Sequence, residues 1–99
     1  MTNNLGPEEA AKFSEALVSE IKGKMGRLDL SSRALGRLIG ESSQYVSMRL
    51  DGGNPRTGKR VDLNAGDIAK IATALDMSVV DLIRVAWTAA GLDQEHELP

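Results

Sequence analysis

Apolar residues recur at helical spacing along most of the chain, and no stretch shows the alternation of a strand. Phe13, Leu17 and Ile21 lie four residues apart, and Gly6 and Pro7 precede them. Proline suits the first turn of a helix, and a four-residue spacing places side chains on one helix face. The pattern predicts an all-α fold of five short helices.

Polar caps and one glycine mark where the later helices begin and end, because serine and asparagine bind the first free N–H groups of a helix. The predicted N-caps are Ser31 or Ser32, Ser42, Asn64 and Ser78, and Gly40 ends the second helix. Helices four and five cover about residues 64–90, and the acidic residues 91–99 are expected to form a frayed tail. At 99 residues the chain is the size of a single domain, 1–99.

The predicted core is aliphatic, because Phe13, Tyr45 and Trp87 are the only aromatic residues. Apolar positions at helical spacing are expected to face inward. These are Ala34, Leu35, Leu38 and Ile39 in helix two, Val46 and Leu50 in helix three, Ile68, Ile71, Ala72 and Leu75 in helix four, and Leu82, Ile83, Val85, Ala86 and Trp87 in helix five.

Composition argues against an enzyme and against a metal or other cofactor. The chain has no cysteine, and its one histidine, His96, stands near the C-terminus. Thiolate sites, cysteine nucleophiles and multi-histidine metal sites are therefore not expected. No apolar run reaches the ~18 residues of a membrane span, and the N-terminus has no basic-then-apolar signal pattern. We expect a cytoplasmic protein without a membrane partner.

The net charge of −2 conceals an uneven distribution. Residues 1–21 carry one base and four acids, a charge of −3. Residues 22–60 carry nine bases and three acids, a charge of +6, and residues 61–99 carry two bases and seven acids, a charge of −5. A basic middle between acidic flanks suggests an anionic partner, although a merely uneven solvated surface would look the same.

Residues 31–50, SSRALGRLIGESSQYVSMRL, hold two short helices joined by a tight turn at Gly40. Such a short connection forces the helices to cross steeply, and Gly36 would let them approach closely. This is the geometry of a helix-turn-helix, whose second helix lies in the DNA major groove. We place that unit at about residues 31–51.

Together with the following LNAGDIAKIATALDMSVVDLIRVA, this stretch resembles the phage-repressor-like (lambda repressor and Cro, XRE-like) helix-turn-helix family. Ala74-Leu75-Asp76-Met77-Ser78 is similar to the A-L-G-V-S that joins the last two helices of many members. The resemblance spans roughly residues 13–86 and implies a five-helix lambda-repressor-like domain. Glu41 and Arg49 depart from the pattern at positions that are usually apolar, which leaves open how the third helix is rotated.

The resemblance implies a set of DNA contacts. Base reading falls to Ser43, Gln44, Ser47 and Met48, and the Gln44 amide can pair with adenine. A methionine at helical spacing, such as Met48, is more often a core residue. Tyr45 is expected at the domain edge with its hydroxyl outward. In the family, backbone N–H groups at the start of helix two, near Ser31 and Ser32, hold a phosphate. Arg33 and Arg37 on the exposed side of that helix either add phosphate contacts or only aid solubility. The remaining candidate phosphate contacts, taken from their charge or hydroxyl group, are Tyr45, Arg49, Arg56, Lys59 and Arg60.

The loop GGNPRTGKR contains G-x-x-x-x-G-K, but Arg60 stands where a P-loop needs serine or threonine for Mg²⁺. No strand precedes it, so no nucleotide is expected. The loop either contacts the DNA backbone or simply connects helices.

The resemblance implies a sequence-specific transcriptional regulator, a repressor of the phage immunity or Cro-like type. It would bind double-stranded DNA and be nucleoid-associated in a bacterial cell or phage-infected host. Helix five carries more apolar surface than one packing face consumes. We therefore expect a homodimer on a pseudo-palindromic operator, with Val80, Ile83 and Trp87 at the interface; otherwise Trp87 covers the domain's own core against helix one. The alternatives are a DNA-binding antitoxin, docking its toxin through the acidic residues 93–97, and an interaction module that keeps the fold without binding DNA.

Overall fold

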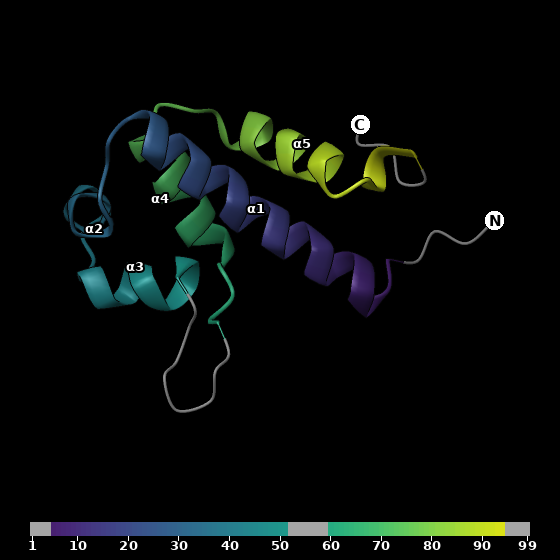
Figure 1. Ribbon diagram of the computed structural model, residues 1–99, viewed down its shortest axis with the longest axis horizontal. Helices are drawn as coiled ribbons and strands as arrows, with labels where there is room; N and C mark the ends of the chain where they lie inside the picture. Colours follow the sequence, from purple (N-terminus) through teal and green to yellow (C-terminus); the bar gives the residue numbers. More distant parts are fainter. Residues whose placement is uncertain (1–4, 52–59, 95–99) are drawn as a thin grey trace.

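The longest helix, α1 (Pro7–Arg27), crosses the whole molecule, and the other helices pack around it (Figure 1). The computed structural model describes residues 5–51 and 60–94. Within these residues the fold is all-helical, with five α-helices, one short 3-10 helix and no strand. The remaining elements are α2 (Ser32–Ile39), α3 (Ser43–Leu50), α4 (Ala65–Ala74), α5 (Val79–Ala89) and the 3-10 helix η1 (Leu92–Gln94).

The helix boundaries follow the predicted caps. Ser31, Ser42 and Ser78 each accept a hydrogen bond from the backbone N–H three residues on. Asn64 does the same and forms a reciprocal capping box with Asp67. Gly40 ends α2 in the left-handed conformation, with φ of 76°. The predicted beginnings of four helices and the end of α2 are thereby confirmed.

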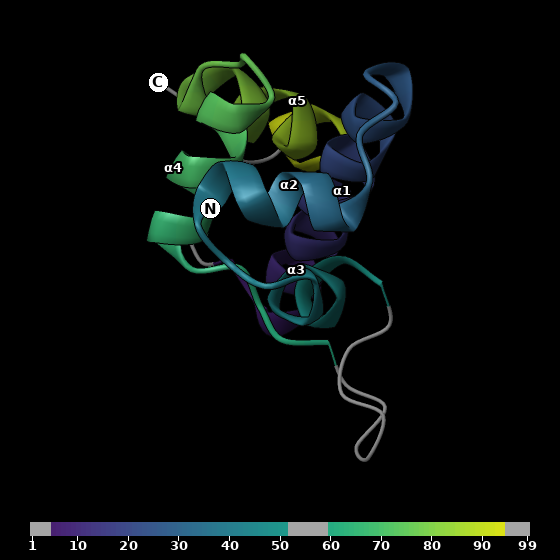
Figure 2. The same cartoon turned by 90° about the vertical axis from the view of Figure 1, so that its left-hand side faces the viewer.

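The core is aliphatic, as predicted. Ile21 in α1, Leu35 in α2, Leu82 in α5 and Leu75 at the C-cap of α4 are completely buried. α5 lies along one side of α1, and α3 lies on the opposite side (Figures 1 and 2). None of the helices in the described ranges is long and apolar enough to cross a bilayer.

Two side chains that were expected inside are exposed. Leu38 is 60% exposed and Val85 is 44% exposed. In α2, Leu35 and Ile39 lie one turn apart and face the core; Leu38 precedes Ile39 by about 100° of helix rotation, which turns it outward. In α5 the pair Leu82 and Ala86 takes the inward face in the same way. Residue spacing alone therefore predicted too many inward-facing side chains in both helices.

The C-terminal tail packs further than predicted. Leu92, in η1, is 5% exposed and lies against the domain, so the chain does not fray from Gly91. An apolar side chain directly after a left-handed glycine turns back onto the end of α5. The rest of the predicted tail, residues 95–99, lies outside the described residues.

Candidate nucleic-acid interface

Gly36 in α2 lies against the backbone of the turn that leads into α3. A Cβ atom at Gly36 would lie 2.6 Å from the Glu41 carbonyl oxygen and 3.2 Å from that of Ser42. The Glu41 N–H donates to the Gly36 carbonyl oxygen at 2.8 Å, which closes the end of α2. α2 appears end-on in Figure 1 and α3 side-on, so the two helices cross steeply, as their short connection predicted.

The rotation of α3 is visible from its buried face. Val46 and Leu50 are each 2% exposed and point into the core. Ser43 and Gln44 are exposed on the outer side, while Ser47 and Met48 are partly buried. Of the four predicted base-reading residues, the first two therefore present their side chains most fully to solvent.

A buried carboxylate ties α3 to α4. Asp67, in the first turn of α4, is 1% exposed. Its Oδ1 accepts a hydrogen bond from the Tyr45 hydroxyl, and its Oδ2 accepts one from Arg49 Nε at 3.1 Å. The Asn64 N–H also donates to Oδ2, at 3.1 Å. The guanidinium carbon of Arg49 lies 3.5 Å from the centre of the Tyr45 ring. We call Tyr45, Arg49 and Asp67 the α3–α4 anchor.

The anchor shifts the pKa values of two of its members. Burial by itself raises the pKa of Asp67. Hydrogen bonds from the Tyr45 hydroxyl, the Asn64 N–H and the Arg49 guanidinium outweigh burial, so this pKa lies below that of an ordinary aspartate. The hydrogen bond donated to Asp67 raises the pKa of Tyr45, and burial and the negative charge of Asp67 raise it further. Asp67 is therefore ionised and Tyr45 neutral across the physiological range.

Two predicted phosphate contacts are already engaged inside the protein. The Tyr45 hydroxyl points at Asp67, which corrects the expectation that it faces outward. The side chain of Arg49 is 16% exposed, pairs with Asp67, and also donates from Nη1 to the Tyr45 carbonyl oxygen at 3.1 Å. The reason is the buried carboxylate, which needs compensating donors. A phosphate contact from either side chain would first have to break the anchor.

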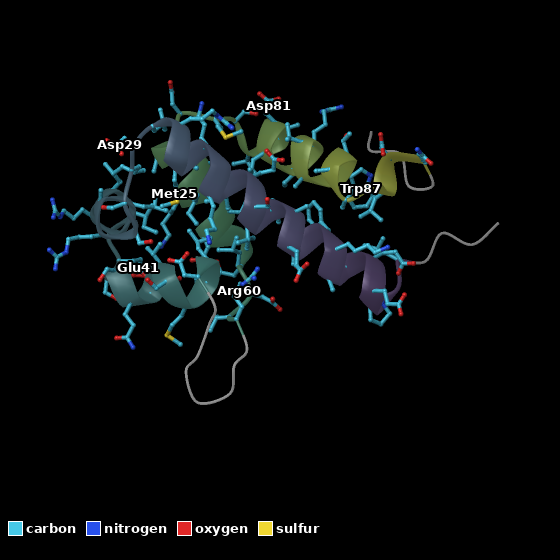
Figure 3. All side chains as sticks on the ribbon, in the orientation of Figure 1. Met25, Asp29, Glu41, Arg60, Asp81 and Trp87 are labelled. Carbon is cyan, nitrogen blue, oxygen red and sulfur yellow. The ribbon has the colours of Figure 1, made fainter. Side chains whose placement is uncertain are left out.

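The other predicted phosphate contacts are spread around α2 and the end of α3. Arg33 and Arg37 are exposed on α2. Arg60 is exposed near the C-terminal end of α3 (Figure 3), where the next residue donates its N–H to the Met48 carbonyl oxygen at 3.0 Å. Arg56 and Lys59 lie outside the described residues.

The start of α2 carries a negative charge as well as serines. Ser31 uses its hydroxyl oxygen to cap the helix. The Ser32 hydroxyl donates to Asp51 Oδ2 at 3.3 Å, and Lys22 Nζ lies 3.1 Å from the other oxygen of that carboxylate. A phosphate at Ser31 and Ser32 would have to share this position with Asp51.

The residues of the predicted dimer interface differ in their surroundings. Val80 is 61% exposed on α5, and Ile83 is partly buried. The Trp87 ring meets the Phe13 ring of α1 edge-on, with centroids 5.5 Å apart, and lies between α5 and α1 (Figure 3). This contact supports the alternative in which Trp87 covers the domain's own core.

No functional role was predicted for Asp67 from the sequence. Its partners Tyr45 and Arg49 lie 22 and 18 residues earlier, and no local pattern joins them. The one available signal was Arg49 itself, a cation at a position that is apolar in the resembling family. Comparison of the chain with models of known families, with curated proteins and with solved structures finds no match.

Proposed function

We propose that this protein is a sequence-specific double-stranded-DNA-binding regulator in which α2 and α3 form a helix-turn-helix. One observation carries the proposal: the turn before α3 packs its backbone against Gly36 of α2, and α3 presents Ser43 and Gln44 at its exposed N-terminal end. A recognition helix contacts base edges with residues near its N-terminus, so this is the end that must be free.

The exposed side chains suit base reading. The Gln44 amide can donate to N7 and accept from N6 of one adenine at the same time and thereby recognise it, and the Ser43 hydroxyl can donate or accept. Among the hydrogen bonds described for α3, none involves the side chain of Ser43 or Gln44. Neither side chain would therefore have to break a hydrogen bond within the domain before it binds a base. α3 is also eight residues long, which fits within a major groove.

The charge distribution supports the same face. Arg33 and Arg37 project from α2, which adjoins α3, and Arg60 follows it. α5, which carries the exposed Asp81, lies on the far side of α1 from α3 (Figures 1 and 3). Phosphates at α3 would meet the positive charges of α2 and Arg60, while Asp81 stays away from them.

A homodimer on DNA is part of the proposal. One small module buries only about 600–1,000 Å² on DNA, which rarely gives the affinity of a regulator. Val80, with Ile83 beside it, supplies apolar surface on α5 for a second copy. Trp87 belongs to the α1–α5 packing and would contribute at the edge of such an interface. Repression by occluding a promoter is the regulatory effect that we infer for a protein of this kind.

A protein-interaction module is the second candidate, and one feature favours it. Leu38, 60% exposed, borders an open groove between α2 and α4 that is lined by Ala69, Thr73 and Ala74. An exposed leucine beside small residues is surface that another protein could cover.

The deciding experiment is footprinting on DNA from the gene's own neighbourhood, together with selection from a random-sequence duplex pool. The proposal expects a protected, pseudo-palindromic site whose half-sites lie about one helical turn apart. Equal affinity for selected and unselected DNA, or no binding to either, would leave the interaction module as the better account.

A further inference from the structure

Asp67 is the one charged residue that the described part of the structure buries, and α3 supplies most of what compensates it. A carboxylate removed from water is costly unless it is paired and hydrogen-bonded. Both of its oxygens bind α3 side chains, one to Tyr45 and the other to Arg49. The anchor therefore joins the proposed recognition helix to the first turn of α4.

The anchor constrains α3 in a way that its apolar contacts do not. Val46 and Leu50 are the only buried side chains of this eight-residue helix. Apolar contacts are not directional, whereas hydrogen bonds need defined distances and angles. Tyr45 and Arg49 stand one turn apart, and their two bonds to one fixed carboxylate restrict rotation and sliding of α3 together.

The anchor is also rigid within itself. The guanidinium of Arg49 stacks on the Tyr45 ring and bonds the Tyr45 carbonyl oxygen, so the two side chains hold each other. Asp67 in turn is fixed by its reciprocal cap with Asn64, whose N–H donates to the oxygen that Arg49 also binds. Each member has partners on more than one side.

We propose that Asp67 is a positioning residue that sets the rotation of α3 and thereby determines how well the protein discriminates between DNA sequences. The inference rests on the proposed function, since it concerns the same helix. Gln44 and Tyr45 are adjacent, so a rotation of α3 that moves Tyr45 also moves the Gln44 amide relative to the bases. Asp67 itself touches no DNA; it acts through Tyr45 and Arg49.

The test compares Asp67→Asn with Asp81→Asn. Both aspartates stand at the third position of a helix whose N-cap binds their backbone N–H, but Asp81 is exposed on α5. Binding of each variant and of the wild type is measured on the selected site and on random duplex DNA, at a temperature where circular dichroism shows a folded protein. Hydrogen exchange of the α3 amides is measured alongside.

We expect Asp67→Asn to lower the ratio of specific to random binding by about tenfold, within the range that one base contact supplies. Amide hydrogen exchange in Asp67→Asn should accelerate, relative to the wild type, more in α3 than in α1 or α5. Asp81→Asn should change neither quantity. Tyr45→Phe keeps the ring under Arg49 and removes only the hydroxyl, so it should lower the ratio of specific to random binding by about threefold. This variant replaces Asp67→Asn in the test if Asp67→Asn does not fold.

An unchanged ratio in a folded Asp67→Asn or Tyr45→Phe protein would overturn the inference, because a purely stabilising role affects the melting temperature alone. A wild type that binds selected and random DNA equally would instead refute the proposed function. The wild-type measurement therefore separates the two failures.

Discussion

Asp76 holds a left-handed backbone conformation directly after α4, with φ of 58°. An L-residue pays about 1–2 kcal/mol for this conformation, and glycine does not. Glycine also stands here in the A-L-G-V-S sequence of the resembling family. Asp76→Gly should therefore raise the free energy of unfolding by about 0.5–1 kcal/mol, after the extra entropy of an unfolded glycine is subtracted.

Urea denaturation measures this change, and Asp81→Gly provides the opposite control. Asp81 lies within the first turn of α5, where a glycine should cost about 1 kcal/mol. Loss of stability in both variants would contradict the prediction. It would mean that the Asp76 side chain stabilises the folded protein by more than its left-handed backbone conformation destabilises it.

The α3–α4 anchor should make stability depend on pH at both extremes. The lowered pKa of Asp67 means that its stabilisation is fully present above the ordinary aspartate pKa of about 4 and is lost as the pH falls through the lowered value. The raised pKa of Tyr45 means that its stabilisation is present below about pH 10 and is lost as the pH rises through the raised value.

Thermal melts of wild type and Tyr45→Phe across the pH range check this prediction. The variant should lack the part of the alkaline loss that belongs to Tyr45. Identical alkaline profiles for the two proteins would show that the hydroxyl is not bonded to Asp67 in solution.

At the scale of elements, the packing of the α2–α3 turn against α2 depends on Gly36. Alanine normally favours a helix over glycine by about 1 kcal/mol. At Gly36, however, the new methyl group would lie 2.6 Å from a backbone carbonyl oxygen, and backbone cannot move aside as a flexible side chain would. We expect Gly36→Ala to destabilise the protein by about 1–3 kcal/mol.

Gly26→Ala is the matched control, because that position lies in α1 and has no atom within 4 Å of the added Cβ. It should be neutral or stabilising by up to about 1 kcal/mol in the same denaturation experiment. A Gly36→Ala protein as stable as Gly26→Ala would show that the backbone of the α2–α3 turn lies further from Gly36 than described.

The elements of this fold were largely predictable because their signals are local. Ser31, Gly40 and Ser42 mark helix ends by groups that act within four residues, and the structure confirms them. Leu38 was placed wrongly because an eight-residue helix offers two similar apolar stripes, and only the position of α4 decides between them. Tyr45 and Asp67 could not be paired from sequence because tertiary packing alone brings them together.

At the scale of the whole molecule, the separation of charge predicts how DNA affinity depends on salt. Each phosphate contact contributes about −0.9 to the slope of log K against log salt, because bound counterions are released. Arg37 is exposed on α2 beside the proposed interface, and Arg84 is exposed on α5, across α1 from it.

Arg37→Ala should weaken specific and random binding alike and should flatten the salt slope by about 1, while Arg84→Ala should leave the slope unchanged. Salt titrations of the two variants test this directly. A flattened salt slope for Arg84→Ala would mean that DNA binds at the face of α5 and would contradict the proposed interface at α2 and α3.

The central claim is that the exposed end of α3 reads DNA sequence, and Gln44→Ala tests it most directly. Gln44 is exposed and its side chain supports no other element, so its removal should leave folding intact. Affinity for the selected site should fall by about 1–3 kcal/mol, while affinity for random duplex should barely change. Equal losses on both DNAs, or no loss on either, would contradict the account.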